Sequence, residues 1–317
     1  MAKKIIFIHG RAQKPAENDL KALWYESVSH GLHRDFGDAG QTLFDNVTKE
    51  FVYYGNFSNA FLGVPDEDPA SRFEALETLK GYTKGQFGKS TYKKVSKAGF
   101  LKEALADTFS AVLGKLHLAQ PLIAAVAPDM AHYWEEEESY FGSDIRNTLT
   151  PRLQAAFDND DQILLVAHSL GTMISYDNLW KFSHYGEYRH QYGSNKKVDL
   201  FITLGSPLSD ENVKAKLKGA DHAGRKKYPT NIRQWCNIAA EDDYISHDGK
   251  LLNDYKDMMK LGMVSGGIRD IHPIYNLNVR NGKSNPHSSI GYLINPKFTE
   301  VLHEWLSRPG TPASADD

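Results

Sequence analysis

The chain has 317 residues, of which 41% are hydrophobic and 24% are charged, with 37 basic against 40 acidic side chains. This apolar content lies near the globular average and excludes a disordered or collagen-like chain. A formal net charge of -3 gives no electrostatic reason to expect nucleic acid as a partner. The length fits two domains, or one α/β domain with an insertion.

Three features of the sequence predict a cytoplasmic protein without a membrane span. The apolar run at residues 5–8 is too short for a signal peptide, whose apolar core takes about 7–15 residues. No stretch approaches the ~20 apolar residues of a transmembrane helix. The single cysteine, Cys236, excludes internal disulfides and indicates a reducing compartment.

Short β-branched and aromatic runs alternate with amphipathic segments along the chain. The strands predicted from these runs span residues 5–8, 51–54, 163–167, 198–204 and 235–239. The helices predicted from apolar residues at helical spacing span 20–32, 145–157, 170–182 and 298–306. This alternation predicts an α/β fold with a mostly parallel central sheet and helices on both faces.

About a hundred residues separate the second predicted strand from the third, far more than a crossover requires. We therefore predict a helical cap over residues 57–140, inserted into a core of residues 1–56 and 141–307. Within the cap, the Gly- and Lys-rich stretch 81–99 predicts a mobile loop. The apolar residues between 100 and 126 either pack the cap onto the core, line a pocket, or make transient contact with a membrane surface. For residues 308–317 the sequence predicts a disordered tail.

One serine lies where a predicted strand passes directly into a predicted helix. Ser169 is flanked two positions away on either side by the small residues Ala167 and Gly171. This pattern is typical of a nucleophile elbow, in which a tight turn holds the serine in a strained conformation and leaves no room for bulk nearby. A simple capped helix can have the same pattern.

With this Ala-x-Ser-x-Gly turn, the chain resembles the α/β-hydrolase superfamily, particularly its lipase and esterase branch. His9-Gly10 is similar to the His-Gly pair of the family's oxyanion loop, and residues 203–208 (Thr-Leu-Gly-Ser-Pro-Leu) are similar to the segment that ends its sixth strand. The resemblance covers most of the chain outside the predicted cap. It implies an α/β-hydrolase fold and a serine hydrolase that cleaves carboxylic esters or lipid-like acyl groups.

A serine hydroxyl becomes a strong nucleophile only beside a base that an acid orients. The resemblance implies that the acid and then the histidine follow Ser169 in the chain. Asp243 is the expected acid, because related lipases place it two residues before an aliphatic side chain; Asp242 and Asp210 are the alternatives. His287, in a late loop before the last helix, is the expected base, with His272 as its rival.

The resemblance also implies an oxyanion hole formed by the backbone N–H groups of Leu170 and Arg11. The Arg11 side chain would either bind an anionic group of a substrate or pair with a structural carboxylate.

The sequence indicates no cofactor and no metal. Residues 88–91 (Gly-Lys-Ser-Thr) lack the earlier glycine of a P-loop, residues 135–138 form a run of four acids typical of a solvated helix face, and His30 and His33 have no matching carboxylate. The expected partner is a small-molecule or lipid-like ester. Two other functions stay open: deacylation of thioesters or amides, and a non-catalytic interaction protein on the same fold.

Overall fold

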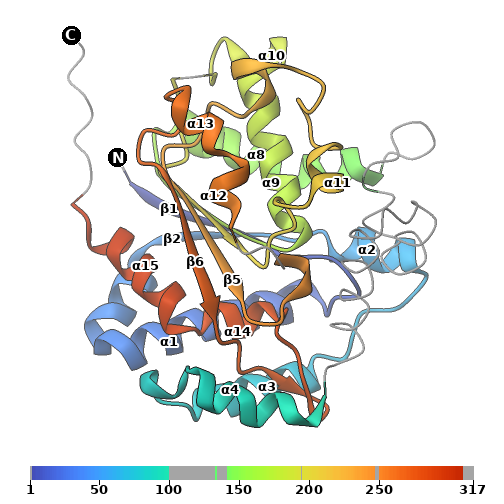
Figure 1. Cartoon of the computed structure of the whole chain (residues 1–317), viewed down its shortest axis with the longest axis vertical. Helices are drawn as coiled ribbons and strands as arrows, with labels where there is room; N and C mark the ends of the chain where they lie inside the picture. Colours follow the sequence, from blue (N-terminus) through green and yellow to red (C-terminus); the bar gives the residue numbers. More distant parts are fainter. Residues whose placement is uncertain (1, 100–132, 134–140, 194, 247–249, 310–317) are drawn as a thin grey trace.

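A six-stranded parallel sheet forms the centre of the molecule, with helices packed on it (Figure 1). The computed structural model describes residues 2–99, 133, 141–193, 195–246 and 250–309. In sheet order the strands are β2 (Thr48–Val52), β1 (Lys3–Ile8), β3 (Gln162–His168), β4 (Leu200–Leu204), β5 (Trp235–Ala240) and β6 (Ile268–Ile274). The predicted α/β class with its parallel sheet is therefore confirmed.

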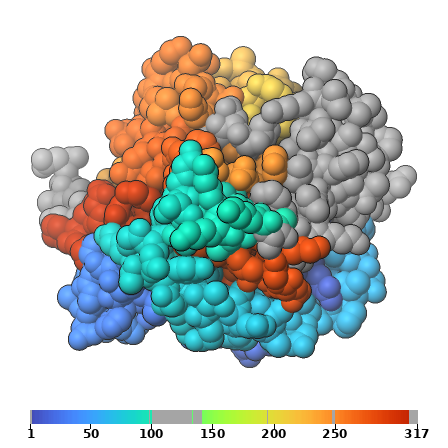
Figure 2. All heavy atoms as spheres, turned by 60° about the horizontal axis from the view of Figure 1, so that its bottom comes forward, coloured from blue at the N-terminus to red at the C-terminus, as the bar shows by residue number. Residues whose placement is uncertain are grey.

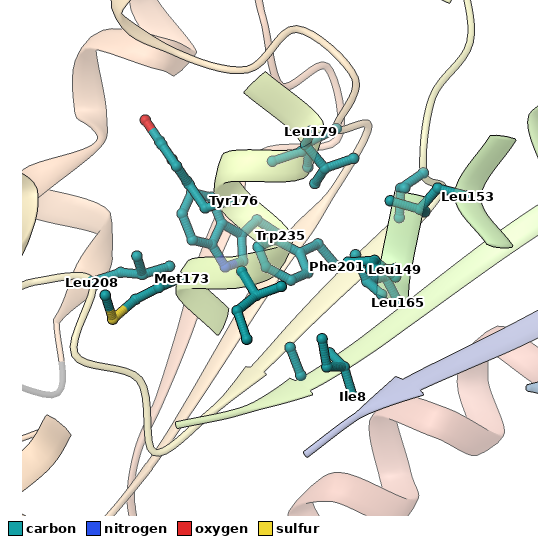
Figure 3. Packing of buried hydrophobic residues seen from close by; sticks show 14 of the residues in the cluster. Ile8, Leu149, Leu153, Leu165, Met173, Tyr176, Leu179, Phe201, Leu208 and Trp235 are labelled. Carbon is teal, nitrogen blue, oxygen red and sulfur yellow. The ribbon is translucent and has the colours of Figure 1, made fainter. Parts of the chain in front are cut away.

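Two sets of helices cover the two faces of the sheet. On one face lie α1 (Glu17–Asn46), α14 (Ser289–Leu293) and α15 (Pro296–Ser307); on the other lie α8 (Phe141–Asp158) and α9 (Leu170–His184). Because successive strand residues point to opposite faces, Ile5 and Phe7 of β1 pack with the first set, whereas Ile6 and Ile8 pack with the second. Figure 3 shows part of the second layer, in which side chains of β1, β3 and β5 meet α8 and α9.

After residue 184, the elements other than β4, β5, β6, α14 and α15 are short and lie in the connections. They are α10 (Gly186–Arg189), α11 (Glu211–Lys214), η3 (Gly224–Lys227), η4 (Tyr244–Ser246), α12 (Leu251–Asp254), α13 (Lys256–Lys260), β7 (Val279–Arg280) and β8 (Lys283–Ser284). No helix in the described part of the chain is long and apolar enough to cross a membrane.

The described part of the segment 57–140, which we predict as a cap, is mostly helical. It contains most of α2 (Gly55–Leu62), followed by α3 (Ala70–Lys80), η1 (Lys84–Gln86), α4 (Lys89–Val95) and η2 (Ser96–Ala98). Residues 100–132 and 134–140 lie outside the described residues, together with the pocket or membrane surface expected there, so the cap itself stays a prediction. Residues 310–317 of the expected tail also lie outside them.

Helical turns occupy much of the stretch 81–99, where the sequence predicts a mobile loop. The Thr83 backbone N–H and hydroxyl both bond to the side chain of Gln86, which fixes the start of η1. Farther on, Tyr92 of α4 is buried with Leu76, Leu79 and Leu277. Figure 2 shows α3 and α4 lying across one face of the molecule beside the α1 region. The capped turn at Thr83 and the burial of Tyr92 therefore stabilise helical structure in this stretch, although its content of glycine and lysine predicts a loop.

Candidate active site

All parallel strands direct their carboxyl ends to one edge of the sheet, and loops at that edge are the usual location of sites in this class. His9 and Gly10 follow β1, Ser169 follows β3, Gly205 follows β4, and Asp243 is the third residue after β5. The order of the strands makes β1, β3, β4 and β5 consecutive neighbours, so these residues lie close together.

The turn that carries Ser169 has the strained geometry expected from its sequence. Ser169 has φ 54° and ψ -127°, a conformation that residues with a side chain rarely adopt, and α9 begins at Leu170 directly after it. The two neighbouring glycines explain how the turn packs. A Cβ at Gly10 would lie 2.6 Å from the Cβ of Ser169, and a Cβ at Gly171 would lie 2.4 Å from the carbonyl oxygen of His9. The loop after β1 therefore rests directly on the serine turn.

The structure brings Ser169, His287 and Asp243 into one hydrogen-bonded chain. His287 Nε2 lies 2.9 Å from Ser169 Oγ, and His287 Nδ1 lies 3.0 Å from each carboxylate oxygen of Asp243. Asp243 and Ser169 are each only 2% exposed. Because Nδ1–H donates to the carboxylate, Nε2 is left as the proton acceptor facing the hydroxyl.

Gly205 makes this arrangement sterically possible. It has φ 53°, and a Cβ there would lie 2.8 Å from Asp243 Oδ2 and 3.1 Å from His287 Nδ1. Any side chain at this position would displace the carboxylate or the imidazole. The glycine of the Gly-Ser-Pro segment therefore serves the close approach of these two groups as well as the turn after β4.

Two further groups bond to the Asp243 carboxylate besides His287. The backbone N–H of Ile245 donates to Oδ1 at 3.1 Å, and the hydroxyl of Tyr292 donates to Oδ2 at 2.5 Å. The Tyr292 hydroxyl itself accepts from the backbone N–H of Ala240 at 2.8 Å. The buried carboxylate is thus bonded through both oxygens, as a charge in the protein interior must be.

The alternative acids and the rival histidine lie elsewhere. Asp242 accepts a hydrogen bond from the hydroxyl of Tyr92 at 3.0 Å. Asp210 caps α11 by accepting from the backbone N–H groups of Asn212 and Val213. His272 is exposed on β6, which stands at the edge of the sheet. Asp243 and His287 are therefore the acid and histidine that the structure brings to Ser169.

Two buried histidines border the serine turn and stay uncharged. Burial holds the pKa of His168 well below its usual value, and charge on His287 would lower it further; His168 Nε2–H donates to the carbonyl of His287 at 2.9 Å. Burial likewise holds the pKa of His9 well below its usual value. His9 Nε2 accepts from the backbone N–H of Tyr54, so its Nδ1–H donates to the Gly10 carbonyl at 2.7 Å.

The loop after β1, which carries Arg11, is fastened by residues that follow β2. Tyr54 donates its hydroxyl to the carbonyl of His9 at 2.7 Å. The buried side chain of Asn59 accepts from the backbone N–H of Lys14 at 2.9 Å and donates to its carbonyl at 2.8 Å. Lys14 Nζ in turn donates to the carbonyl of Arg11. Arg11 therefore follows a residue in direct contact with Ser169, within a loop that α2 holds in place.

Comparison with known proteins gives no relative: no family model, curated protein or solved structure matches the chain. The functional inference therefore rests on the geometry of the site and on the sequence motifs that carry the resemblance. Among the described residues, no three His, Cys, Asp or Glu side chains are grouped so that they could hold a metal ion.

Sequence reasoning did not anticipate three residues that support this site, namely Tyr292, Asn59 and Tyr54. Each acts on a segment distant in the chain, and the separation is 49 residues for Tyr292 and Asp243. Tyr292 lies five residues after His287 in the same short segment, and this proximity is the one local feature that points to it.

Proposed function

We propose that this chain is a serine hydrolase of the α/β-hydrolase fold that cleaves carboxylic esters or lipid-like acyl groups. The observation that carries the proposal is the unbroken contact from Ser169 Oγ through His287 to Asp243, at 2.9 Å and 3.0 Å. The strained turn at Ser169 supports it, because such strain is typical of a nucleophilic serine in the tight turn between a strand and a helix.

In the proposed reaction, Ser169 Oγ attacks the ester carbonyl while His287 Nε2 takes the hydroxyl proton. The tetrahedral intermediate collapses, the proton passes from His287 to the departing alkoxide, and the acyl group stays on Ser169. Water then attacks the acyl-enzyme, giving one proton to His287, which returns it to Ser169 as the carboxylic acid leaves. Asp243 stabilises the imidazolium present in both steps.

The negative oxygen of the two intermediates requires donors that are already in place. Leu170 is the first residue of α9, where backbone N–H groups have no acceptor within the helix. The second proposed donor is the N–H of Arg11, and the contact between Gly10 and Ser169 places this segment beside the serine. Two backbone donors, one at the start of α9 and one in the loop after β1, would then hold the oxyanion.

The first experiment is labelling of the full-length protein with a fluorophosphonate probe. We expect stoichiometric labelling that is lost in Ser169→Ala and kept in Ser27→Ala, a buried serine of α1 whose hydroxyl donates to the carbonyl of Leu23. Labelling that persists in Ser169→Ala would contradict the proposed nucleophile.

Turnover assays then define the reaction class. An ester, a thioester and an amide with one shared acyl group should show the ester hydrolysed with the highest kcat/KM. A higher value for the thioester or amide would make the chain a deacylase of that class. If p-nitrophenyl esters of every chain length are left intact and the probe does not react, the chain is a non-catalytic protein.

A further inference from the structure

The carboxylate of Asp243 accepts a hydrogen bond from a tyrosine that is not part of the proposed triad. The hydroxyl of Tyr292 donates to Oδ2 at 2.5 Å, on the same oxygen that accepts from His287 Nδ1 at 3.0 Å. A contact of 2.5 Å lies at the short end of the usual range for a hydrogen bond from a hydroxyl to a carboxylate. The hydroxyl proton of Tyr292 and the imidazole proton of His287 therefore share one carboxylate oxygen.

The orientation of the Tyr292 hydroxyl is fixed by its other contact. The backbone N–H of Ala240, the last residue of β5, donates to the Tyr292 oxygen at 2.8 Å. With that lone pair occupied, the hydroxyl proton points to Asp243. The ring is fully buried, and burial raises the pKa of Tyr292 well above its usual value, so the hydroxyl keeps its proton throughout the range in which an esterase is assayed.

Tyr292 also links the two segments that must meet at Ser169. It lies in α14, directly after the loop that carries His287, whereas its partner Ala240 ends β5 and its partners Asp243 and Ser246 lie just after that strand. The loop after β5 is thus attached to the loop before α14 through His287 and to α14 itself through Tyr292. A change in the position of either loop must stretch both connections.

We infer that Tyr292 is a positioning residue of the proposed hydrolase: it fixes the Asp243 carboxylate against His287 and withdraws part of its negative charge. This inference rests on the proposed function. Its first consequence is geometric, because a carboxylate held through both oxygens keeps the imidazole aligned with Ser169. Its second is electrostatic, because a donor to Oδ2 weakens the attraction of the carboxylate for the protonated imidazole.

Among the described residues, two titratable groups that lie against His287 are Asp243, from the loop after β5, and His168, from the end of β3, whose ring lies 4.7 Å from that of His287. His168 is uncharged, because burial holds its pKa well below the usual value. Asp243 is therefore the charge through which a change at Tyr292 reaches His287.

The test compares Tyr292→Phe with Tyr192→Phe in the full-length protein. Tyr192 is a matched control, since it is also buried and its hydroxyl also donates to a carboxylate, that of Asp158, at 2.8 Å. Active enzyme is counted by fluorophosphonate titration, and kcat and KM for a p-nitrophenyl ester are measured between pH 5 and 9. Normalising to titrated sites removes any loss that comes from unfolded protein.

For Tyr292→Phe we expect kcat to fall about tenfold with little change in KM, because the carboxylate is no longer held in place. We also expect the acid limb of the kcat/KM profile to move to higher pH by roughly half a unit, because a more negative Asp243 favours the protonated imidazole. Tyr192→Phe should match the wild type in both. A purely structural role would lower the yield of titratable sites and leave the acid limb unchanged, and that result would overturn the inference.

A second variant keeps the inference testable if Tyr292→Phe does not fold. Incorporation of 3-fluorotyrosine at position 292 preserves the hydroxyl and nearly the volume of the ring, and it makes the hydroxyl a stronger donor. The acid limb should then move to lower pH, opposite to the shift in Tyr292→Phe; an unmoved limb contradicts the inference. Loss of labelling in Ser169→Ala is an independent readout, so the proposed hydrolase can stand while the role of Tyr292 fails.

Discussion

Replacing Gly10 by alanine tests whether the loop after β1 must touch the serine turn. The added Cβ would lie 2.6 Å from the Cβ of Ser169 and 2.8 Å from Nδ1 of His168, whereas ordinary contacts begin at 3.4 Å. Neither neighbour can move freely, because Ser169 is held between β3 and α9 and the ring of His168 is bonded to the carbonyl of His287. The loop that carries Arg11 must therefore retreat by about 1 Å.

A displacement of about 1 Å costs roughly 100-fold in rate when it moves a group that stabilises the transition state. For Gly10→Ala we expect kcat to fall by about this factor with a smaller change in KM, and the free energy of unfolding to fall by about 1–3 kcal/mol. Both are measured on the folded protein, by ester turnover per titrated site and by urea unfolding.

The matched control is Gly186→Ala at the start of α10, where an added Cβ meets nothing within 4 Å. This variant should keep wild-type activity and stability. If Gly10→Ala turns over esters within twofold of the wild type, the loop after β1 does not supply a donor to the oxyanion and the role proposed for Arg11 is wrong.

Three further predictions concern the acid, the loop anchor and the buried histidines. Asp243→Asn should lower kcat per titrated site by about 10⁴-fold while near-wild-type urea unfolding is kept; a loss below tenfold would remove Asp243 from the mechanism. Asn59→Ala should lower the free energy of unfolding by about 1–3 kcal/mol, because the N–H and carbonyl of Lys14 lose their buried partner, and kcat should fall with it; unchanged kinetics would show that the loop does not need this anchor. Because burial lowers the pKa of His9 and His168, the unfolded chain binds protons below about pH 6.5 that the folded chain does not. Stability should therefore be complete above that pH and decrease below it by about 1.4 kcal/mol per pH unit for each histidine, as measured by urea unfolding at pH 7.5 and 5.5; equal midpoints would contradict the buried neutral state.

The four inner strands could be predicted from the sequence. Of the two edge strands, β2 is predicted at 51–54 but lies at Thr48–Val52, and β6 is not predicted. Residues 163–167 are apolar throughout because β3 is covered on both faces, so its run of side chains stands out. The strand β6 escaped prediction because it pairs with β5 alone and carries Asp270, His272 and Pro273, of which His272 and Pro273 are exposed. Charged residues and proline are tolerated in an edge strand, and they interrupt the apolar pattern from which a strand is predicted.

A similar division holds for the site. The turn at Ser169 has a local pattern that constrains the backbone, and it could be located from the sequence without knowledge of distant residues. Asp243 and His287 required the resemblance to supply their order and place. Tyr292 and Asn59 could not be predicted, because each acts through hydrogen bonds to a residue that is distant in the sequence and close only in the folded protein.

The wide spacing of the contacting residues has a consequence for the newly made chain. Ser169 leaves the ribosome 118 residues before His287, a delay of roughly 6–24 s at ordinary rates of synthesis. Throughout that interval the hydroxyl lacks the imidazole of His287, which is the base proposed to take its proton. In the proposed hydrolase, an incomplete polypeptide without His287 therefore cannot form an acyl-enzyme through the triad. The chain becomes able to react only after the segment before α14 has been synthesised.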